Sequence, residues 1–250
     1  MELTSSTLGI FWNSTPFFLL NNYSSENVNV TLQGRTFYKD GNWNTLCLPF
    51  DVENLTGTPL QGATLMELGN SDACNTGFDA STGTLNLEFV AASKIEAGHA
   101  YIVKWTSGSN IENPVFNGIT VRNEDPNGQE VISKDEKVSF RGTYDFTTYA
   151  DNNKSILFLG GNNKLYYPQN GASIGAFRAY FQLNGITAAD INPNNVKMFF
   201  GDGTETGIID ARGNMKDGRG DGVIYNIAGQ RLNKPQRGIN IVNGKKIVIK

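Results

Sequence analysis

Few side chains in this sequence could carry out catalysis. The one histidine, His99, follows Ala97-Gly98 and precedes an apolar run. A Ser-His-Asp triad would have to use this residue, and a histidine-based metal site would need further ligands at defined spacing. We therefore interpret His99 as a turn residue at the start of a strand. The sequence predicts no catalytic residue, no metal site and no cofactor.

Carboxylates offer a second route to catalysis, because glycoside hydrolysis uses two of them about 5–9 Å apart across a cleft. Four acidic residues lie on or beside expected strands: Asp51, Glu67, Glu88 and Glu96. The sequence does not show which of them face one another, and we interpret them as surface charges. The Asp-rich turns at 202–205 and 217–222 lack the alternating oxygen ligands and closing Glu of a calcium-binding loop. The sequence therefore predicts a protein that is not an enzyme, with a glycoside hydrolase as the least favoured function.

Aromatic side chains give the best argument for ligand binding. Sugar rings stack on exposed Trp and Tyr, while Asn and Asp side chains satisfy the sugar hydroxyls. We predict four ligand-binding residues, each of which could instead pack in the core or at a sheet edge: Trp43, Tyr166, Tyr167 and Tyr180. Trp43 lies in an Asn-flanked turn and Tyr180 on the polar face of its strand, whereas Trp105 lies in phase with apolar neighbours and is expected in the core.

The two cysteines are too few for a cysteine-rich metal site or a disulfide scaffold. Cys47 lies within the apolar run 46–50 and is expected to be a small buried hydrophobic residue. Cys74 lies in a polar loop at 70–76. A bridge between the two is the alternative, which an oxidising environment would permit.

Alternation of apolar and polar residues with a period of two predicts strands along most of the chain. The expected strands are 28–32, 44–50, 63–68, 84–90, 100–106, 114–121, 137–142, 155–159, 164–167, 177–183 and 196–200. Asp40-Gly41 between strand-like flanks predicts a hairpin at 38–43. The best helical stretch, 91–97, is barely two turns long. The expected fold class is all-β, an antiparallel β-sandwich for which a jelly-roll-like arrangement is one option.

Charge and length limit the partners of the protein. The net charge of −3 gives no general attraction to nucleic acid or to anionic membranes. No run of about 18 apolar residues is present, so the sequence predicts no membrane span. A chain of 250 residues can form one large β domain.

The charge distribution divides the chain into a body and a tail. Residues 222–250 carry six Lys/Arg and no acidic residue, whereas the preceding 221 residues carry 15 basic and 24 acidic ones. We expect a β-sandwich body at 1–210, with a softer boundary near 122–137, a Gly-rich linker at 211–222 and a basic β tail at 223–250. The Arg219-Gly220-Asp221 tripeptide matches an integrin-binding motif, but the composition of a Gly-rich linker explains it more simply.

The tail resembles the C-terminal segment of many exported Bacteroidetes proteins, in the pattern Y-N-x-x-G-Q-R … K-G-I-x-I-x-N-G-K-K-x-x-x-K. The residues of this sorting pattern are Tyr225, Gly229, Gly238, Gly244, Lys245 and Lys246. More distantly, the tail is similar to the C-terminal signal of type IX secretion substrates. Those signals contain more strands than 29 residues supply, so the tail is expected either to be a reduced version or to complete a sheet of the body.

The body also resembles a module of secreted Bacteroidetes surface proteins. The resemblance is carried by RTFYKDGNWNTLCLPF at 35–50, with further matches at 57–67, 95–105, 113–116, 158–160 and 176–183. It implies an exported protein at the cell surface or beyond it, acting as an adhesion or interaction module with an extracellular protein or glycan as partner. A carbohydrate-binding module is the alternative. Residues 9–20 are too polar for a signal-peptide core, so we expect such a peptide to have been removed.

Overall fold

The computed structural model describes residues 7–11, 27–122, 125–169 and 172–201, together with segments at 224–226, 231–232, 238–242 and 245–249. For residues 7–11 and the C-terminal segments, only the backbone is described. The chain divides into two compact units, Met1–Met215 and Lys216–Lys250. The linker expected at 211–222 lies outside the described residues.

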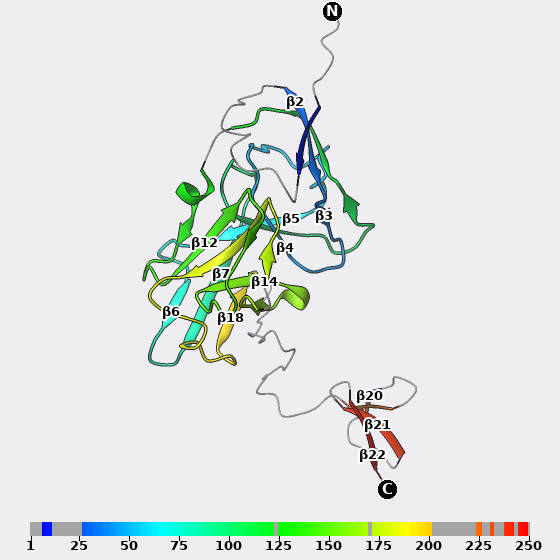
Figure 1. Ribbon diagram of the computed structural model, residues 1–250, viewed down its shortest axis with the longest axis vertical. Helices are drawn as coiled ribbons and strands as arrows, with labels where there is room; N and C mark the ends of the chain where they lie inside the picture. The colour runs from blue at the N-terminus through cyan, green and yellow to red at the C-terminus, as the bar shows by residue number, and fades with distance from the viewer. Residues whose placement is uncertain are drawn as a thin grey trace, which may run out of the picture. The chain divides into compact units, whose positions relative to one another are not determined.

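The described residues form strands and two short 3-10 helices, Pro126–Gln129 and Gly161–Asn163, with no α-helix among them. The predicted all-β, sandwich-like fold is confirmed (Figure 1). No helix within these described segments has the length and apolar character needed to cross a bilayer.

The largest sheet of the body has six strands. Its order is β18 (Val196–Phe199), β7 (Thr84–Ala91), β5 (Thr64–Leu68), β8 (Tyr101–Lys104) and β4 (Asn44–Leu46), and β6 (Gly77–Asp79) pairs with β7. A second sheet has five strands, in the order β11 (Val131–Ile132), β12 (Val138–Thr143), β17 (Arg178–Leu183), β14 (Ile156–Leu159) and β15 (Leu165–Tyr166).

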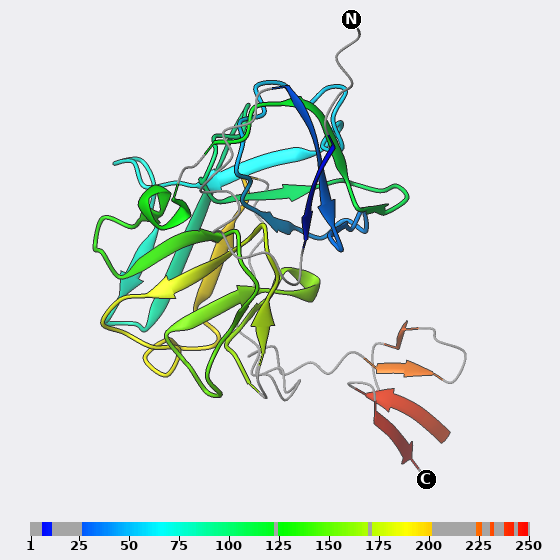
Figure 2. The same cartoon turned by 45° about the horizontal axis from the view of Figure 1, so that its top comes forward.

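Smaller sheets complete the body. A three-stranded sheet has the order β1 (Thr7–Phe11), β2 (Val28–Gln33) and β10 (Val115–Ile119). Two ribbons pair β3 (Thr36–Phe37) with β9 (Ile111–Glu112), and β13 (Thr147–Thr148) with β16 (Ser173–Ile174). In Figure 2 the blue strands β1 and β2 lie at one end of the body, and yellow β17 with its green neighbours lies at the other. Most pairings are antiparallel, but β1–β2 and β18–β7 are parallel.

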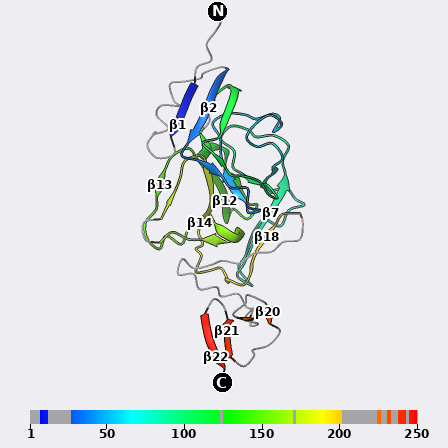
Figure 3. The same ribbon diagram turned by 90° about the vertical axis from the view of Figure 1, so that its right-hand side faces the viewer.

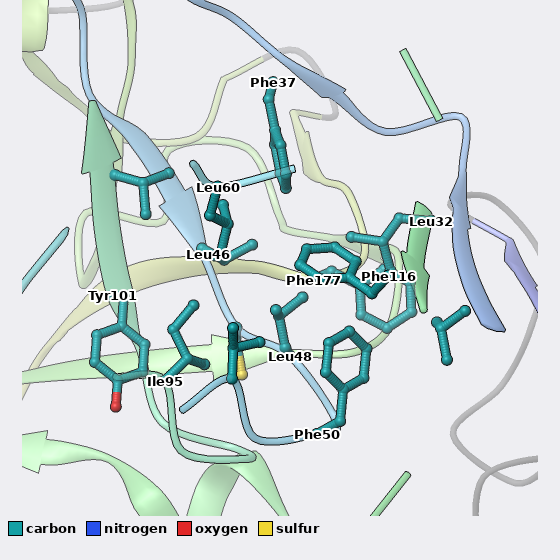
Figure 4. Close-up of a cluster of buried hydrophobic side chains, with 14 of the residues drawn as sticks. Leu32, Phe37, Leu46, Leu48, Phe50, Leu60, Ile95, Tyr101, Phe116 and Phe177 are labelled. Carbon is teal, nitrogen blue, oxygen red and sulfur yellow. The ribbon is translucent and has the colours of Figure 1, made fainter. Parts of the chain in front are cut away.

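The six-stranded sheet separates two hydrophobic cores, because neighbouring side chains on a strand point to opposite faces. Leu65 and Val103 point into the first core, which also contains the side chains of β2, β3 and β10. Met66 and Ile102 point into the second core, which fills the space between the two large sheets. Figure 4 shows the first core, where the rings of Phe50 and Phe116 pack with centroids 5.1 Å apart.

The C-terminal unit is a four-stranded antiparallel sheet in the order β20 (Arg231–Leu232), β19 (Ile224–Asn226), β21 (Gly238–Val242) and β22 (Lys245–Ile249). The pairing of Val242 with Lys245 leaves Asn243-Gly244 between β21 and β22. Asn-Gly is the sequence favoured between the strands of a two-residue hairpin. The expected C-terminal hairpin is therefore formed by β21 and β22, with β19 and β20 beside it.

The hairpin predicted at 38–43 is wrong. The two strands that flank this segment pair elsewhere, β3 with β9 and β4 with β8. The Asn44 side chain joins the ends of the segment instead, because its Oδ1 accepts from Tyr38 N (3.0 Å) and its Nδ2 donates to Tyr38 O (2.9 Å). Gly41 adopts φ +85°, so the Asp-Gly signal indicates a turn correctly although no strand ladder follows it.

Both cysteines are free, so the alternative of a bridge between Cys47 and Cys74 is wrong. Cys47 is buried as predicted, and its Sγ lies 3.3 Å from Gly98 O. Burial raises the pKa of the Cys47 thiol, which keeps it protonated and unreactive.

Candidate ligand-binding face

The outer face of the five-stranded sheet carries the aromatic cluster that best fits a ligand site. Strand β17 alternates as the sequence predicts: Ala179, Phe181 and Leu183 are buried in the second core, and Arg178, Tyr180 and Gln182 are half-buried on the other side. Figure 3 shows β12 and β14 between the β13 ribbon and strands β7 and β18, so the outer face is the side toward β13.

Three aromatic residues on neighbouring strands lie across this face. Phe158 of β14 pairs directly with Tyr166 of β15. Ile156 pairs with Gln182, and continuing that antiparallel register places Phe158 opposite Tyr180. All three side chains are half-buried, which leaves part of each available to a ligand.

Tyr149, which follows the β13 strand, joins the three residues into one cluster. Its ring lies edge-on to Phe158 (centroids 5.5 Å apart) and to Tyr180 (5.7 Å). Burial, the nearby phenol of Tyr180 and a hydrogen bond with that phenol raise the pKa of Tyr149. We call the set Tyr149, Phe158, Tyr166 and Tyr180 the aromatic face.

A charged pair borders the aromatic face. Arg141 pairs with Tyr180 across β12 and β17, and its guanidinium donates through Nε and Nη2 to the two carboxylate oxygens of Glu130. Such a two-bond contact holds both side chains in a fixed geometry. It places a fixed donor and acceptor array at the edge of the face, as polar recognition of a sugar requires.

Gly160 determines where the Tyr166 ring lies. A side chain at Gly160 would begin 2.6 Å from the Tyr166 ring, so the ring occupies the space that a Cβ would need. The hydroxyl of Tyr166 also reaches Gly161 O at 3.5 Å. The Tyr166 ring is therefore held down along the turn between β14 and β15.

Of the predicted ligand residues, the structure brings Tyr166 and Tyr180 together and separates the other two. Trp43 is 6% exposed, so its expected exposure is wrong. The Trp43 ring stacks on Phe200 (5.1 Å), and Lys104 Nζ lies 4.5 Å above it. The physical reason is that no hairpin projects from the sheet at this point.

Tyr167, which follows β15, packs against the second core and not on the aromatic face. It is half-buried against the second core, and Lys154 Nζ lies 5.8 Å from its ring. Trp105 is 3% exposed, as the sequence predicts for a core residue.

Two of the candidate carboxylates line an open hollow with Glu53, Lys94 and Arg122. Asp51 accepts from Ala97 N (2.8 Å) and pairs with Arg122 Nε (2.8 Å), while Glu96 pairs with Lys94 (2.8 Å). Both carboxylates therefore have cationic partners, which is the surface-charge role expected of them.

Glu88 and Glu67 lie elsewhere. Glu88 borders a second hollow with Phe89 and Phe199, and its Oε2 accepts from Asn75 N (2.9 Å). Glu67 Oε2 lies 3.1 Å from His99 Nε2, which makes no hydrogen bond to the described residues. No group of three or more possible metal ligands occurs within the described residues.

His99 occupies the turn position that the sequence predicts. Its backbone N donates to Glu96 O (3.2 Å), and the preceding Gly98 adopts φ +82°. The imidazole packs against Tyr101 with centroids 4.8 Å apart.

Several sequence candidates lie outside the described residues: the Asp-rich turns at 202–205 and 217–222, the tripeptide Arg219-Gly220-Asp221, Gly229 and Gly244. In the C-terminal unit, Tyr225 lies in β19, Gly238 begins β21, and Lys245 and Lys246 begin β22.

Sequence reasoning missed Phe158 as part of the site and did not place Tyr149 among the four predicted ligand-binding residues. Strand 155–159 consists mostly of apolar residues, so its alternation does not distinguish the outer face from the core. The available signal was that Ile156 and Phe158, two residues apart, lie on the same face of a strand. Comparison with models of protein families, with curated proteins and with solved structures finds no match to this chain.

Proposed function

We propose that the body is a non-catalytic glycan-binding module of an exported protein, with the aromatic face as its binding surface. The observation that carries this proposal is the gathering of four half-buried aromatic side chains on one side of a sheet, from four separate segments of the chain. An outer sheet face usually carries polar side chains, so a cluster of partly exposed aromatic rings there is a candidate for ligand recognition.

The chemistry of the face fits a saccharide. Aromatic rings offer apolar surfaces for the C–H groups of a sugar, and the phenol groups of Tyr149, Tyr166 and Tyr180 are hydrogen-bonding partners for its hydroxyls. The Arg141–Glu130 pair adds fixed donors and acceptors at one edge. The edge-on packing of Tyr149 limits the area for stacking, which favours one or two sugar rings over a long chain.

A glycan array with the full chain tests the proposal, followed by calorimetry with the best neutral hit. Truncation of a central interface aromatic typically costs at least about 2 kcal/mol, so Tyr180→Ala should weaken binding roughly 30-fold. Tyr180→Phe keeps the ring and should retain most of the affinity. Tyr167→Ala is the matched control, because Tyr167 packs against the second core. A blank array, or equal binding by Tyr180→Ala, would contradict the proposal.

A protein partner is the second candidate, because exposed apolar side chains lie on two segments that border the outer face. Ile132 is 40% exposed at the end of β11, and Phe146 is 41% exposed just before β13. An adhesion or interaction module would present such residues at its interface. Under this alternative the array stays blank, while Ile132→Ser weakens adhesion of beads coated with the protein to host-cell protein extracts from which glycans have been removed.

Export is supported by the resemblance of the C-terminal unit to sorting segments of surface proteins. Its sheet carries basic residues on paired strands, with Lys245 and Lys246 opposite Val242 and Ile241. Fractionation of cells that produce the chain with and without residues 222–250 tests whether the C-terminal unit is a sorting signal. An unchanged distribution would leave the C-terminal unit with a structural role only.

A further inference from the structure

Arg35 is a buried cation with an incomplete set of partners. Its side chain is fully buried, and its one hydrogen bond to the described residues is from Nη2 to Thr45 O, at 2.6 Å. Nε and Nη1 have no partner within the described part of the chain. Its guanidinium also lies 5.5 Å from the Phe37 ring centroid. Buried guanidinium groups are normally paired with an anion, so this arrangement indicates a missing counter-charge.

A second arginine, Arg178, comes near Arg35 at residues 45–47. Arg35 donates to Thr45 O, and Phe177 O, which directly precedes Arg178, accepts from Cys47 N. Burial, followed by the charge of Arg178, holds the pKa of Arg35 well below its usual range. Burial also lowers the pKa of Arg178. Two guanidinium groups therefore lie close to the same segment of the chain, and that of Arg35 has two nitrogens without a partner among the described residues.

The arginine pair is continuous with the aromatic face. Arg178 and Tyr180 point to the same side of β17, and Arg178 is half-buried, so a ligand on the face can reach it.

The backbone before Arg178 is held in an uncommon conformation. Phe177 adopts φ +57°, a left-handed conformation that bulky residues rarely take, and its carbonyl accepts from Cys47 N (3.3 Å). Phe177 is buried in the first core, whereas Ala179 is buried in the second. The strained residue thus directs Arg178 outward at the point where the chain passes from one core to the other. Such strain is often found where a side chain must be placed for function.

We propose that the ligand of the aromatic face is an acidic saccharide, whose carboxylate or sulfate binds Arg178 and is attracted by the positive charge of Arg35 behind it. This inference rests on the proposed glycan-binding function and specifies its ligand class. Arg178 is the group that contacts the anion. Arg35, which is fully buried, contributes charge without contact and is a positioning residue.

The test compares acidic with neutral saccharides of matched size on the full chain by calorimetry. The probes are a tetramer of galacturonic acid, a tetramer of galactose, and a chondroitin sulfate tetramer with and without its sulfate groups. A charge-assisted contact predicts a preference of about 10- to 100-fold for galacturonic acid over galactose if the anion is a carboxylate, or for sulfated over unsulfated chondroitin, which keeps its carboxylates, if the anion is a sulfate. A preference within the galacturonic acid and galactose pair identifies carboxylate as the anion, and a preference within the chondroitin pair identifies sulfate.

Variants show which residue causes the preference for the acidic saccharide. Arg178→Gln should reduce it to about twofold or less while leaving the affinity for the neutral tetramer unchanged, and Arg178→Lys should retain part of it. Arg35→Met should also reduce the preference, although Arg35 makes no contact with the ligand. Arg122→Gln is the control, because Arg122 pairs with Asp51 at a separate hollow. Circular dichroism confirms that each variant is folded.

The outcomes separate this inference from the function on which it rests. Equal binding of acidic and neutral saccharides would overturn the inference and leave glycan binding in place. Binding of none of the saccharides would contradict the glycan-binding proposal, and the anion site is then tested with inorganic sulfate at constant ionic strength. Greater thermal stabilisation of the wild type than of Arg178→Gln by sulfate would support the anion site, and equal stabilisation of both would overturn it. A preference that survives in Arg178→Gln would also overturn the inference.

Discussion

Replacing Arg35 by methionine should stabilise the protein. Arg35 is fully buried, with Nε and Nη1 lacking partners within the described part of the chain. An uncompensated charge in a protein interior costs on the order of 3–5 kcal/mol, even after the surroundings relax. Methionine has a similar length, no charge and enough flexibility to fill the space of the arginine stem.

The magnitude follows from the interactions that the substitution removes. Loss of the hydrogen bond to Thr45 O costs about 1.5–3 kcal/mol, including the carbonyl left without its donor. Loss of the contact with the Phe37 ring costs about 0.5–1 kcal/mol. Subtraction from the cost of the buried charge leaves Arg35→Met more stable than the wild type by about 1 kcal/mol.

Urea unfolding followed by tryptophan fluorescence measures the difference, in chloride buffer without sulfate or phosphate. The midpoint should rise while the slope stays the same, which is the signature of changed stability alone. Arg122→Met is the control, since Arg122 is exposed and its ion pair contributes at most about 1 kcal/mol. Destabilisation of Arg35→Met by more than about 1 kcal/mol would refute the reasoning, because it would show that Arg35 already has a stabilising partner.

Three further predictions concern packing, pH and the turn at 38–43. Gly142→Ala should cost about 2–3 kcal/mol in urea unfolding, because the added Cβ would overlap the Cys47 side chain, and Cys47→Ala in the same chain should recover part of the loss. The raised pKa of Tyr149 means that this phenol keeps its proton to a higher pH in the folded state than in the unfolded state. The free energy of unfolding should therefore fall as pH rises past about 10, where the unfolded state loses the proton. Tyr149→Phe should show a shallower fall between pH 10 and pH 11, and an equal fall would contradict this assignment. Asn44→Ala should cost about 1–2 kcal/mol in the same assay, because it removes both hydrogen bonds to the Tyr38 backbone, and an unchanged midpoint would contradict that role.

Period-two alternation predicted the strands well where one face is apolar and the other polar. Residues 177–183 are the clearest case, and β17 buries the odd-numbered residues while it leaves Tyr180 on the outer face. The strands expected at 28–32, 84–90 and 196–200 likewise correspond to β2, β7 and β18. These strands were predictable because each is amphipathic within a few residues, independent of its partners.

The turn at 38–43 shows what alternation cannot predict. Asp40-Gly41 is a true turn, but whether strands pair across it depends on which other strands compete for the same edges. The Asn44 side chain takes the place of that pairing, and Trp43 consequently packs on Phe200. Phe200 is far from Trp43 in sequence, so no local pattern indicates this contact.

The arginine site was hidden for a related reason. Arg35 precedes a short strand of two residues, where a charged side chain is expected to be in solvent. The Phe37 ring beside it is only two residues away, but the hydrogen bond to the β4 carbonyl at Thr45 comes from tertiary structure. The burial of a charge is decided by the sum of such contacts, and composition or spacing cannot reveal it.

The position of β17 between two cores would hold the proposed binding face in a fixed geometry. Phe177 is fixed in the first core, and Ala179, Phe181 and Leu183 are fixed in the second. The intervening outward residues, Arg178 and Tyr180, are therefore attached to a backbone that is held from both ends. A ligand that binds them loses less free energy to ordering the protein, which is the advantage of a preorganised site. The strain at Phe177 is then part of the same arrangement, because a relaxed backbone at that residue would redirect Arg178 away from the aromatic face.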